Sequence, residues 1–470
     1  MRIASKIEKL LSILILLASV SAGTAVKAQA PDDRPVIVTT PPLVPVAKPL
    51  PPVSMPTTVP RPVSYDRQEF DPVRAEKFYQ HGHDALTGGD KDRAIEEFEL
   101  SCDYGNAKSC FNVGLLNEER LAAAFKGNPN LDPKGDPRLE KFMIFFNKAC
   151  TAGFSRGCVA AANYYRREIY GFYDLPRAVQ LIRKACDAGE IEGCEELGEL
   201  HYQGLGVEVD LPRAASLFKQ GCDANGRVLS CFNYALMREK GKGIAVDHPE
   251  AIRYYRTGCQ RGSNDSCINL AFDYVQQGKS EHNMELAIGL FRTACNRGGL
   301  VACNNQGKLI RELKPSPESD AEAAGLFRKA CDGGNGEGCR SLALLAQDGV
   351  KVAGSKRDSV RLHIKGCELN YGAACYNAGL GYWSGYNAPK SAANGLNYFG
   401  KGCKLGDASS CAGAALAATS LKKGDPAGGD ENARKWLEQG RYLDPANALV
   451  KSLGDWLDKP KKESSEAPRL

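Results

Sequence analysis

Apolar and polar residues recur along most of this 470-residue chain with the period of an α-helix, and the same arrangement returns many times. The residue eight places before a recurring cysteine is small: Ala94, Ala178, Ala214, Ala251, Ala287 and Ala323. The residue four places before it is bulky: Phe98, Phe146, Ile182, Phe218, Tyr255, Phe291, Phe327 and Phe399. Because these offsets share one face of a helix, they predict an amphipathic helix that ends at each of these cysteines.

A turn and a second helix are predicted after each such cysteine. Three residues later the chain has only glycine or asparagine, which best tolerate a left-handed backbone: Gly105, Gly153, Gly189, Asn225, Gly262, Gly298, Gly334, Asn370 and Gly406. A second cysteine then begins another helix, whose fourth following residue is always glycine or alanine. Each cysteine pair therefore spans the turn of a predicted helical hairpin.

The eighteen cysteines form nine such pairs, all but one with seven residues between its members. The pairs are Cys102 and Cys110, Cys150 and Cys158, Cys186 and Cys194, Cys222 and Cys231, Cys259 and Cys267, Cys295 and Cys303, Cys331 and Cys339, Cys367 and Cys375, and Cys403 and Cys411. From Cys150 onward the pairs recur every 36 or 37 residues, which is typical of stacked supersecondary units. We expect an all-α fold, a right-handed α-solenoid of about nine to ten hairpins. The longer step before Cys150 is interpreted as an inserted loop from Glu119 to Pro137.

The chemistry of the paired cysteines favours disulfides. Structural zinc prefers cysteines two to four residues apart, whereas evenly paired cysteines in an exported chain indicate disulfide bonds. We therefore expect each C-x7-C pair to staple its own hairpin, with zinc binding as the alternative.

The ends of the chain predict export. Residues 1–30 combine basic residues with a short apolar run, as in a signal peptide cleaved near residues 22–30; an uncleaved helical anchor is the alternative. Residues 31–72 are interpreted as a proline-rich extended linker, 73–458 as the solenoid and 459–470 as a disordered tail. We expect a periplasmic or secreted protein with no membrane span after cleavage. Removal of residues 1–30 lowers the net charge from +5 to +2, because they carry four basic residues and one glutamate, and so small a charge argues against a nucleic-acid partner.

One repeat carries a family resemblance. The segment from Cys194 to Val207, followed by Asp210-Leu-Pro-Arg-Ala214 and Phe218, resembles the Sel-one-like repeat, a relative of the tetratricopeptide repeat. The cysteine-bearing version resembles the Helicobacter cysteine-rich protein family, over roughly Ala75 to Trp456. That family is associated with penicillin binding and β-lactamase activity. The resemblance therefore implies an alternative function, a β-lactam hydrolase or a binder of penicillin or peptidoglycan.

Three motifs resemble catalytic signatures, but each falls on ordinary repeat positions. Gly153-Phe-Ser155-Arg-Gly157 matches the nucleophile elbow of hydrolases, yet it lies between two predicted helices. Ser216-Leu-Phe-Lys219 fits S-x-x-K and Arg256-Thr-Gly258 approaches K-T-G, but no S-D-N element occurs. We assign no catalytic residue, and whether the protein is an enzyme stays open. The six histidines form no metal-ligand pattern beyond His81-x-His83, so no metal or other cofactor is expected.

A row of asparagines is the candidate binding feature. Five of the nine repeats have asparagine two residues after the second cysteine: Asn112, Asn233, Asn269, Asn305 and Asn377. In tetratricopeptide superhelices this position faces the concave groove, and an amide offers both a donor and an acceptor to a peptide backbone. The alternative is that each asparagine bonds to the start of its own helix. The sequence thus predicts an interaction scaffold for a protein or extended peptide in the periplasm, with a cell-wall-associated partner as one version. It leaves the oligomeric state open.

Overall fold

The computed structural model describes residues 70–127, 137–167, 171–224, 227–278, 280–421 and 424–458. Throughout these residues the regular elements are helices and no strand occurs. They divide into two compact units, which we call the N-terminal unit (to residue 266) and the C-terminal unit (from residue 267). The predicted signal peptide, nearly all of the predicted linker and the predicted tail lie outside the described residues.

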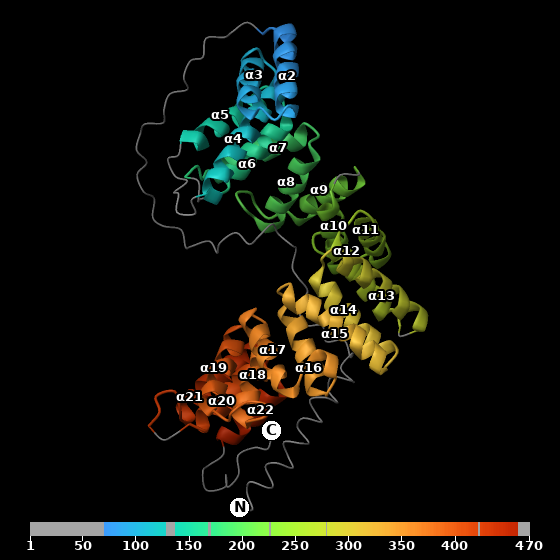
Figure 1. Ribbon diagram of the computed structural model, residues 1–470, viewed down its shortest axis with the longest axis vertical. Helices are drawn as coiled ribbons and strands as arrows, with labels where there is room; N and C mark the ends of the chain where they lie inside the picture. Colours follow the sequence, from blue (N-terminus) through green and yellow to red (C-terminus); the bar gives the residue numbers. More distant parts are fainter. Residues whose placement is uncertain are drawn as a thin grey trace, which may run out of the picture. The chain divides into compact units, whose positions relative to one another are not determined.

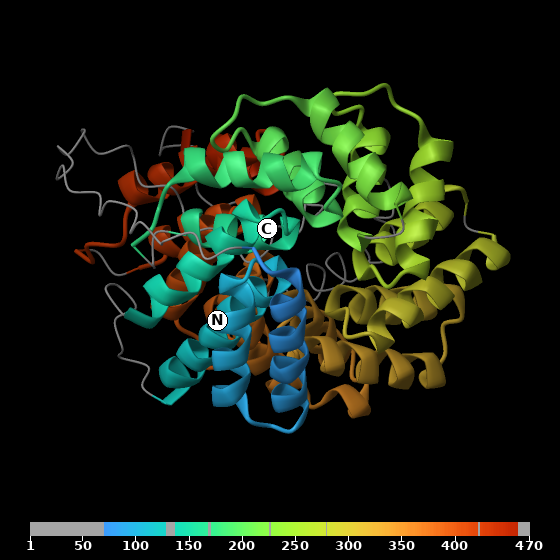
Figure 2. The same ribbon diagram turned by 90° about the horizontal axis from the view of Figure 1, so that it is seen from above.

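The N-terminal unit is a succession of antiparallel helices (Figure 1). They are α2 (Pro72–Thr87), α3 (Lys91–Asp103), α4 (Ala107–Gly127), α5 (Pro137–Thr151), α6 (Ser155–Tyr165), α7 (Leu175–Asp187), α8 (Ile191–Gln203), α9 (Leu211–Asp223), α10 (Val228–Lys240) and α11 (His248–Gln260). Figure 2 shows the α2–α3 hairpin, in blue, with its two helices side by side. α12 (Asn264–Gln276) begins in this unit and ends in the next.

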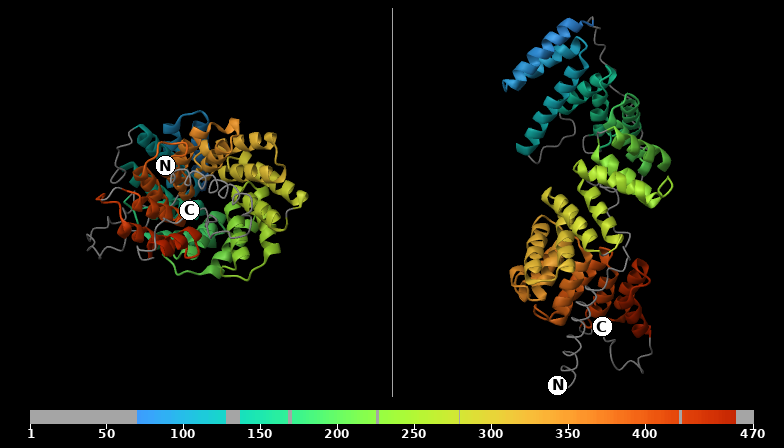
Figure 3. Two further views of the ribbon diagram at one scale, coloured as in Figure 1. Left: turned by 90° about the horizontal axis from the view of Figure 1, so that it is seen from below. Right: turned by 90° about the vertical axis from the view of Figure 1, so that its right-hand side faces the viewer.

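The C-terminal unit repeats the same arrangement, in yellow to red in Figure 3. Its helices are α13 (Glu281–Asn296), α14 (Leu300–Leu313), α15 (Pro317–Asp332), α16 (Gly336–Gln347), the 3-10 turn η2 (Lys351–Ala353), α17 (Lys356–Glu368), α18 (Gly372–Ser384), α19 (Ala392–Lys404), α20 (Ala408–Thr419), α21 (Asp430–Leu443) and α22 (Ala448–Asp458). From α2 to α11 and from α13 to α22 each helix packs against the next along the chain, so the predicted all-α fold of successive hairpins is confirmed.

The hairpin turns adopt the predicted left-handed conformation. The third residue after the first cysteine has a positive φ in eight repeats: Gly105, Gly153, Gly189, Gly262, Gly298, Gly334, Asn370 and Gly406. The ninth, Asn225, lies outside the described residues. A glycine or asparagine is needed here because other side chains would strain this backbone conformation.

Disulfides close the hairpins as predicted. Eight pairs are bonded with Cα atoms 4.4 to 4.8 Å apart. They join Cys102 to Cys110, Cys150 to Cys158, Cys186 to Cys194, Cys222 to Cys231, Cys295 to Cys303, Cys331 to Cys339, Cys367 to Cys375 and Cys403 to Cys411. Cys259 and Cys267 are also disulfide-bonded.

The spacing within these bonded pairs is also the predicted one. The sequence separation is eight in every measured pair except that of Cys222 and Cys231, where it is nine. All eighteen cysteines lie in the described part of the chain, and none of them is left free. The zinc alternative is therefore wrong, because no thiolate remains to bind the metal.

Small and bulky positions of neighbouring repeats fit together. An ideal Cβ added at Gly307 would come within 2.7 Å of the Phe327 ring, and one at Gly379 within 2.6 Å of the Phe399 ring. The fully buried aromatic ring therefore occupies the space that the missing side chain leaves on the preceding helix. Larger residues at these glycines would push the hairpins apart.

The predicted loop from Glu119 to Pro137 begins too early. α4 continues as a helix to Gly127, with Leu121 buried and the Lys91 ammonium 2.6 Å from the Glu119 carboxylate. The run Leu-Ala-Ala-Ala after Arg120 has high helix propensity and extends the helix, whereas the turn-forming residues start only at Gly127.

The helices of each unit fall into two sets. Those that carry the second cysteine of a pair, here called the inner helices, also contact the inner helix two elements away: α6 with α8, α14 with α16, α16 with α18 and α18 with α20. The other set makes fewer such contacts. The inner helices therefore line the more tightly curved side within each unit. Among the described helices, none is both long and apolar enough to cross a membrane.

Candidate functional site

The predicted asparagine row lies on the inner helices, but its members differ in exposure. Asn112 on α4 is half-buried, whereas Asn233 on α10 is only 1% exposed and its Oδ1 atom has no hydrogen-bond partner. Asn233 is thus covered by its own fold. The N-terminal unit therefore offers only Asn112 of the predicted row to a ligand.

The C-terminal unit brings together the other three asparagines. Asn269 on α12, Asn305 on α14 and Asn377 on α18 occupy equivalent positions and are half-buried. Between the last two, α16 has Ser341, which is 6% exposed. These residues form one line of polar groups along the inner helices of this unit.

The amides of the row are not used for capping. In the described part of the chain, no hydrogen bond ties any of the five asparagine side chains to a protein group, and the Nδ2 atom of Asn377 is buried without a partner. The alternative, in which each asparagine bonds to the start of its own helix, is therefore not what the structure shows. The amides of Asn112, Asn269 and Asn305 therefore remain without an internal partner, whereas the Oδ1 atom of Asn233 and the Nδ2 atom of Asn377 are buried.

In the N-terminal unit the equivalent position on α8 holds a carboxylate. The Glu196 Oε2 atom lies 3.4 Å from Arg166 Nη1, with only 14% and 12% of these side chains exposed. Burial raises the pKa of Glu196 to about 7, although the Arg166 charge acts in the opposite direction. The sequence analysis considered only the asparagines at this position and missed this pair. Arg166 is the C-cap residue of α6.

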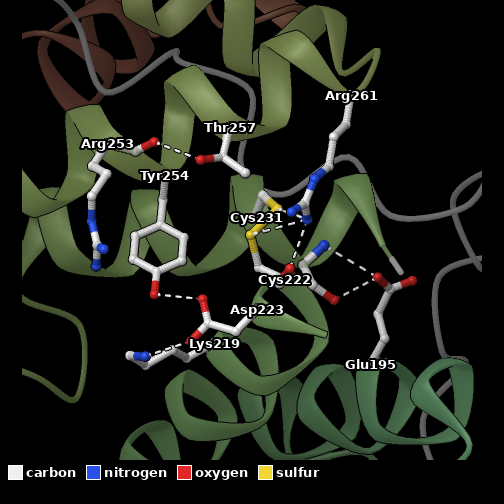
Figure 4. Close-up of a disulfide and its surroundings, with 10 residues drawn as sticks. Glu195, Lys219, Cys222, Asp223, Cys231, Arg253, Tyr254, Thr257 and Arg261 are labelled. Carbon is white, nitrogen blue, oxygen red and sulfur yellow. Dashed lines mark hydrogen bonds and ion pairs between the residues drawn. A yellow bond between two sulfur atoms is a disulfide. The ribbon is translucent and has the colours of Figure 1, made fainter. Parts of the chain in front are cut away.

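The S-x-x-K motif does not form a catalytic pair. Figure 4 shows Lys219 directed at Asp223, with the Nζ atom 2.5 Å from the carboxylate, and Tyr254 donating to the same carboxylate at 2.8 Å. The hydrogen bond with Asp223 raises the pKa of Lys219, which favours the protonated ammonium over the free amine that a general base needs. Ser216 is exposed on the same helix.

The two other catalytic resemblances also lie on ordinary repeat surfaces. Ser155 is the first residue of α6, between two helices rather than on a strand-to-helix turn, and its Oγ donates to Glu190 at 3.3 Å. Arg256 is an exposed residue of α11.

The histidines are scattered. His81 lies 3.4 Å from the Glu97 carboxylate, and the described residues contain no group of three or more histidine, cysteine, aspartate or glutamate side chains suited to a metal. His363 is the exception in burial, since it is fully enclosed on α17. It replaces the bulky apolar residue found four places before the cysteine in the other repeats.

Comparison with known proteins identifies the repeat. The family model of the Sel1 repeat matches six segments, residues 156–190, 191–226, 228–263, 264–299, 307–335 and 372–407. No curated protein matches the chain.

Among solved structures, the chain resembles c5321, a protective antigen of uropathogenic Escherichia coli strains with an SLR fold. The sequences are 20% identical, the match covers 78% of this chain and 83% of that chain, and the TM-score is 0.52. It also resembles a Sel1 repeat protein from Oxalobacter formigenes, with 17% sequence identity and a TM-score of 0.51. That match covers 70% of this chain and 94% of that chain. Helicobacter pylori cysteine rich protein B matches over 27% of this chain and 92% of its own, with 26% identity and a TM-score of 0.24. The first two likenesses concern the fold alone.

Proposed function

Since the chain is a Sel1-repeat protein, we propose that it is an exported scaffold whose inner helices bind an extended peptide segment of a protein partner. Repeats of this class generally mediate protein interactions, because each added unit extends the surface without altering the core. The bound segment lies along the C-terminal unit, over Asn269, Asn305 and Asn377.

The asparagine amides carry this proposal. Each offers an acceptor and two donors, which match the carbonyl and N–H groups of an extended backbone. All three are half-buried and make no hydrogen bond to the described protein, so a peptide can pair with their amides without displacing an internal contact, except at the Nδ2 atom of Asn377, which is buried. Binding through the backbone implies little dependence on the partner's side chains.

The charge of the surface indicates which class of peptide it can bind. Inner helix α18, which carries Asn377, contains no aspartate, glutamate, lysine or arginine, whereas α12 contains two aspartates and α14 contains two basic residues and one glutamate. Because these charges do not share one sign, the surface favours an uncharged segment over a strongly acidic or basic one. Neighbouring inner helices are about 9 Å apart and an extended chain rises about 3.3 Å per residue. Spanning the three repeats from Asn269 to Asn377 therefore takes about eight residues.

The oxidised cysteines support the location. Disulfides persist in oxidising compartments and are rare in the cytosol, and all eighteen cysteines of this chain are disulfide-bonded. The proposed scaffold therefore works in the periplasm or after secretion, with a cell-envelope or cell-wall-associated protein as its partner. The β-lactamase alternative has no support from the described side chains, because Lys219 is held by Asp223.

The experiment measures binding of fluorescent, uncharged twelve-residue peptides, blocked at both ends, to the oxidised protein by anisotropy. Asn305→Ala combined with Asn377→Ala removes two amides, each worth about 1 kcal/mol, and should weaken binding roughly tenfold or more. Asn296→Ala, an exposed asparagine of α13, is the matched control and should leave affinity unchanged. Equal affinity for the double variant and the control would exclude the asparagine row as the peptide site.

A further inference from the structure

The N-terminal unit has a hollow in its surface that is separate from the asparagine row. Residues of α7, of α8, of the loop between α8 and α9 and of the start of α9 line it, and its volume is about 690 Å³. Volumes of this order are typical of small-molecule sites. Among the lining residues are Arg183, His201, Glu208, Val209, Asp210 and Leu211.

The side chain that leaves room for the hollow is His201. It lies seven residues after the second cysteine of its repeat, and its Nδ1 atom is 3.4 Å from the backbone oxygen of Glu208. In the next repeat Arg238 takes this position. It donates to the equivalent backbone oxygen, that of Ala245, at 2.8 Å and also pairs with Glu250. We attribute the hollow to this exchange of a long, paired side chain for a shorter one.

Two opposite charges line the hollow without an internal partner. Arg183 and Glu208 are exposed, and in the described part of the chain neither side chain takes part in an ion pair or a hydrogen bond. In the next repeat the equivalent of Arg183 is Lys219, whose Nζ atom lies 2.5 Å from the carboxylate of Asp223, four residues later. Arg183 also has an acid four residues later, Asp187, but does not pair with it. A guanidinium and a carboxylate therefore stay free for a ligand.

Apolar side chains form another part of the lining. Val209 is 60% exposed and Leu211 is half-buried. An ideal Cβ added at Gly243 would lie 2.4 Å from the Leu211 Cβ, so the backbone of the next loop packs directly on this side chain. The second lining carboxylate, that of Asp210, is already in use, because it accepts a hydrogen bond from Arg213 N at 2.9 Å and caps α9.

We propose that this hollow binds an apolar zwitterion, an amino acid or short peptide whose ammonium and carboxylate groups are both free. The ligand carboxylate pairs with Arg183, its ammonium group pairs with Glu208, and its apolar side chain covers Val209 and Leu211. A guanidinium can donate two parallel hydrogen bonds to a carboxylate. A simple anion would be repelled by Glu208 and a simple cation by Arg183, whereas a zwitterion supplies both missing partners.

The test uses isothermal titration calorimetry of the oxidised full chain with leucine and with the dipeptide leucyl-leucine, near neutral pH. The tighter of the two identifies the source of the ligand. Arg183→Leu should weaken its binding about fivefold, the effect of one ion pair in an open site. The C-terminal amide of the same ligand lacks the carboxylate, so it should bind the wild type and Arg183→Leu equally well.

A second variant tests the other end of the ligand. Glu208→Gln should weaken binding of the zwitterion by a similar factor, but should not change binding of its N-acetyl form, which lacks the ammonium group. Arg256→Leu is the matched control, because Arg256 is an exposed arginine at the equivalent position of α11 and does not line the hollow. It should leave the affinity unchanged.

Three results would each overturn the proposal. They are no heat of binding with millimolar ligand, equal affinities of Arg183→Leu and Arg256→Leu, and equal affinities of the wild type for the zwitterion and its blocked forms. The variant with Asn305→Ala and Asn377→Ala should bind the zwitterion as the wild type does. Failure of this site and failure of the asparagine row are therefore separate outcomes.

Discussion

Acid should destabilise the C-terminal unit through one residue, His363. Its imidazole is fully buried on α17 and makes no hydrogen bond. Burial, together with the nearby charge of Arg340, lowers the pKa of His363 to about 3 from an ordinary value of 6.5. The folded protein therefore keeps this ring neutral over the whole mildly acidic range.

The sign and size of the effect follow from proton linkage. Above pH 6.5 the ring is neutral in both the folded and the unfolded chain, so it makes no difference to how the free energy of unfolding varies with pH. Below that pH only the unfolded chain binds the proton, and the free energy of unfolding falls by about 1.4 kcal/mol for each pH unit. At pH 4.5 the loss reaches about 2.7 kcal/mol and continues toward the folded-state pKa.

The assay compares urea unfolding of the wild type and His363→Phe at about pH 7.5 and pH 4.5, with hydrogen exchange of α16 to α18 as the local readout. Phenylalanine is the residue most repeats use at this position, so the variant should fold. It should lose about 2.7 kcal/mol less stability on acidification than the wild type. His282→Gln, at an exposed histidine of α13, should not change the pH dependence.

Equal acid sensitivity of the wild type and His363→Phe would refute the reasoning. It would mean that the ring gains a proton in the folded state, through a water or a shift of Arg340 that relieves the burial.

Three further predictions concern a close contact between helices, a disulfide and the ionisation of a buried carboxyl. Gly338→Ala should destabilise the protein by about 1–3 kcal/mol, because a Cβ there would lie 2.6 Å from the Ala330 Cβ. Adding Ala330→Gly should restore stability against urea, and failure of that rescue would contradict the steric explanation. Replacing Cys331 and Cys339 by alanine should cost about 2.5 kcal/mol and speed hydrogen exchange mainly in that hairpin; uniform loosening of both units would contradict a local staple. Glu196→Gln should stabilise the protein relative to the wild type, and increasingly so as the pH rises from 4.5 to about 7. Over this range the carboxyl ionises in the unfolded chain, whereas in the folded chain its raised pKa keeps it protonated. Urea unfolding measures this, and a difference in stability that stays constant with pH would show that the carboxyl ionises normally.

The contacts within one hairpin could be predicted because they are local and repeated. The residue before each first cysteine is always alanine, glycine or serine, and the structure places it against the residue before the second cysteine. The sequence pattern alone did not reveal how the two complement each other: Gly402 faces Ser410, whereas Ala330 faces Gly338. In these two hairpins only one larger side chain fits between the helices, so volume is conserved across the pair rather than at either position.

The candidate site was only partly predictable, because the exposure of its residues depends on contacts between repeats. The spacing located the asparagines on one set of helices, but not that Asn233 would be covered while Asn305 stays half-buried. That difference depends on side chains of adjacent repeats.

By itself, the sequence determined the helices, their turns and the disulfide pairing, because each rests on residues fewer than about ten positions apart that recur with the period of the repeat. Only the tertiary structure decided the pairing of Arg166 with Glu196 and the full burial of His363. Arg166 and Glu196 lie thirty positions apart in the chain, and their pairing is not repeated. A single contact between residues distant in the chain leaves no period in the sequence, and its energy depends on burial that only the packed repeats create.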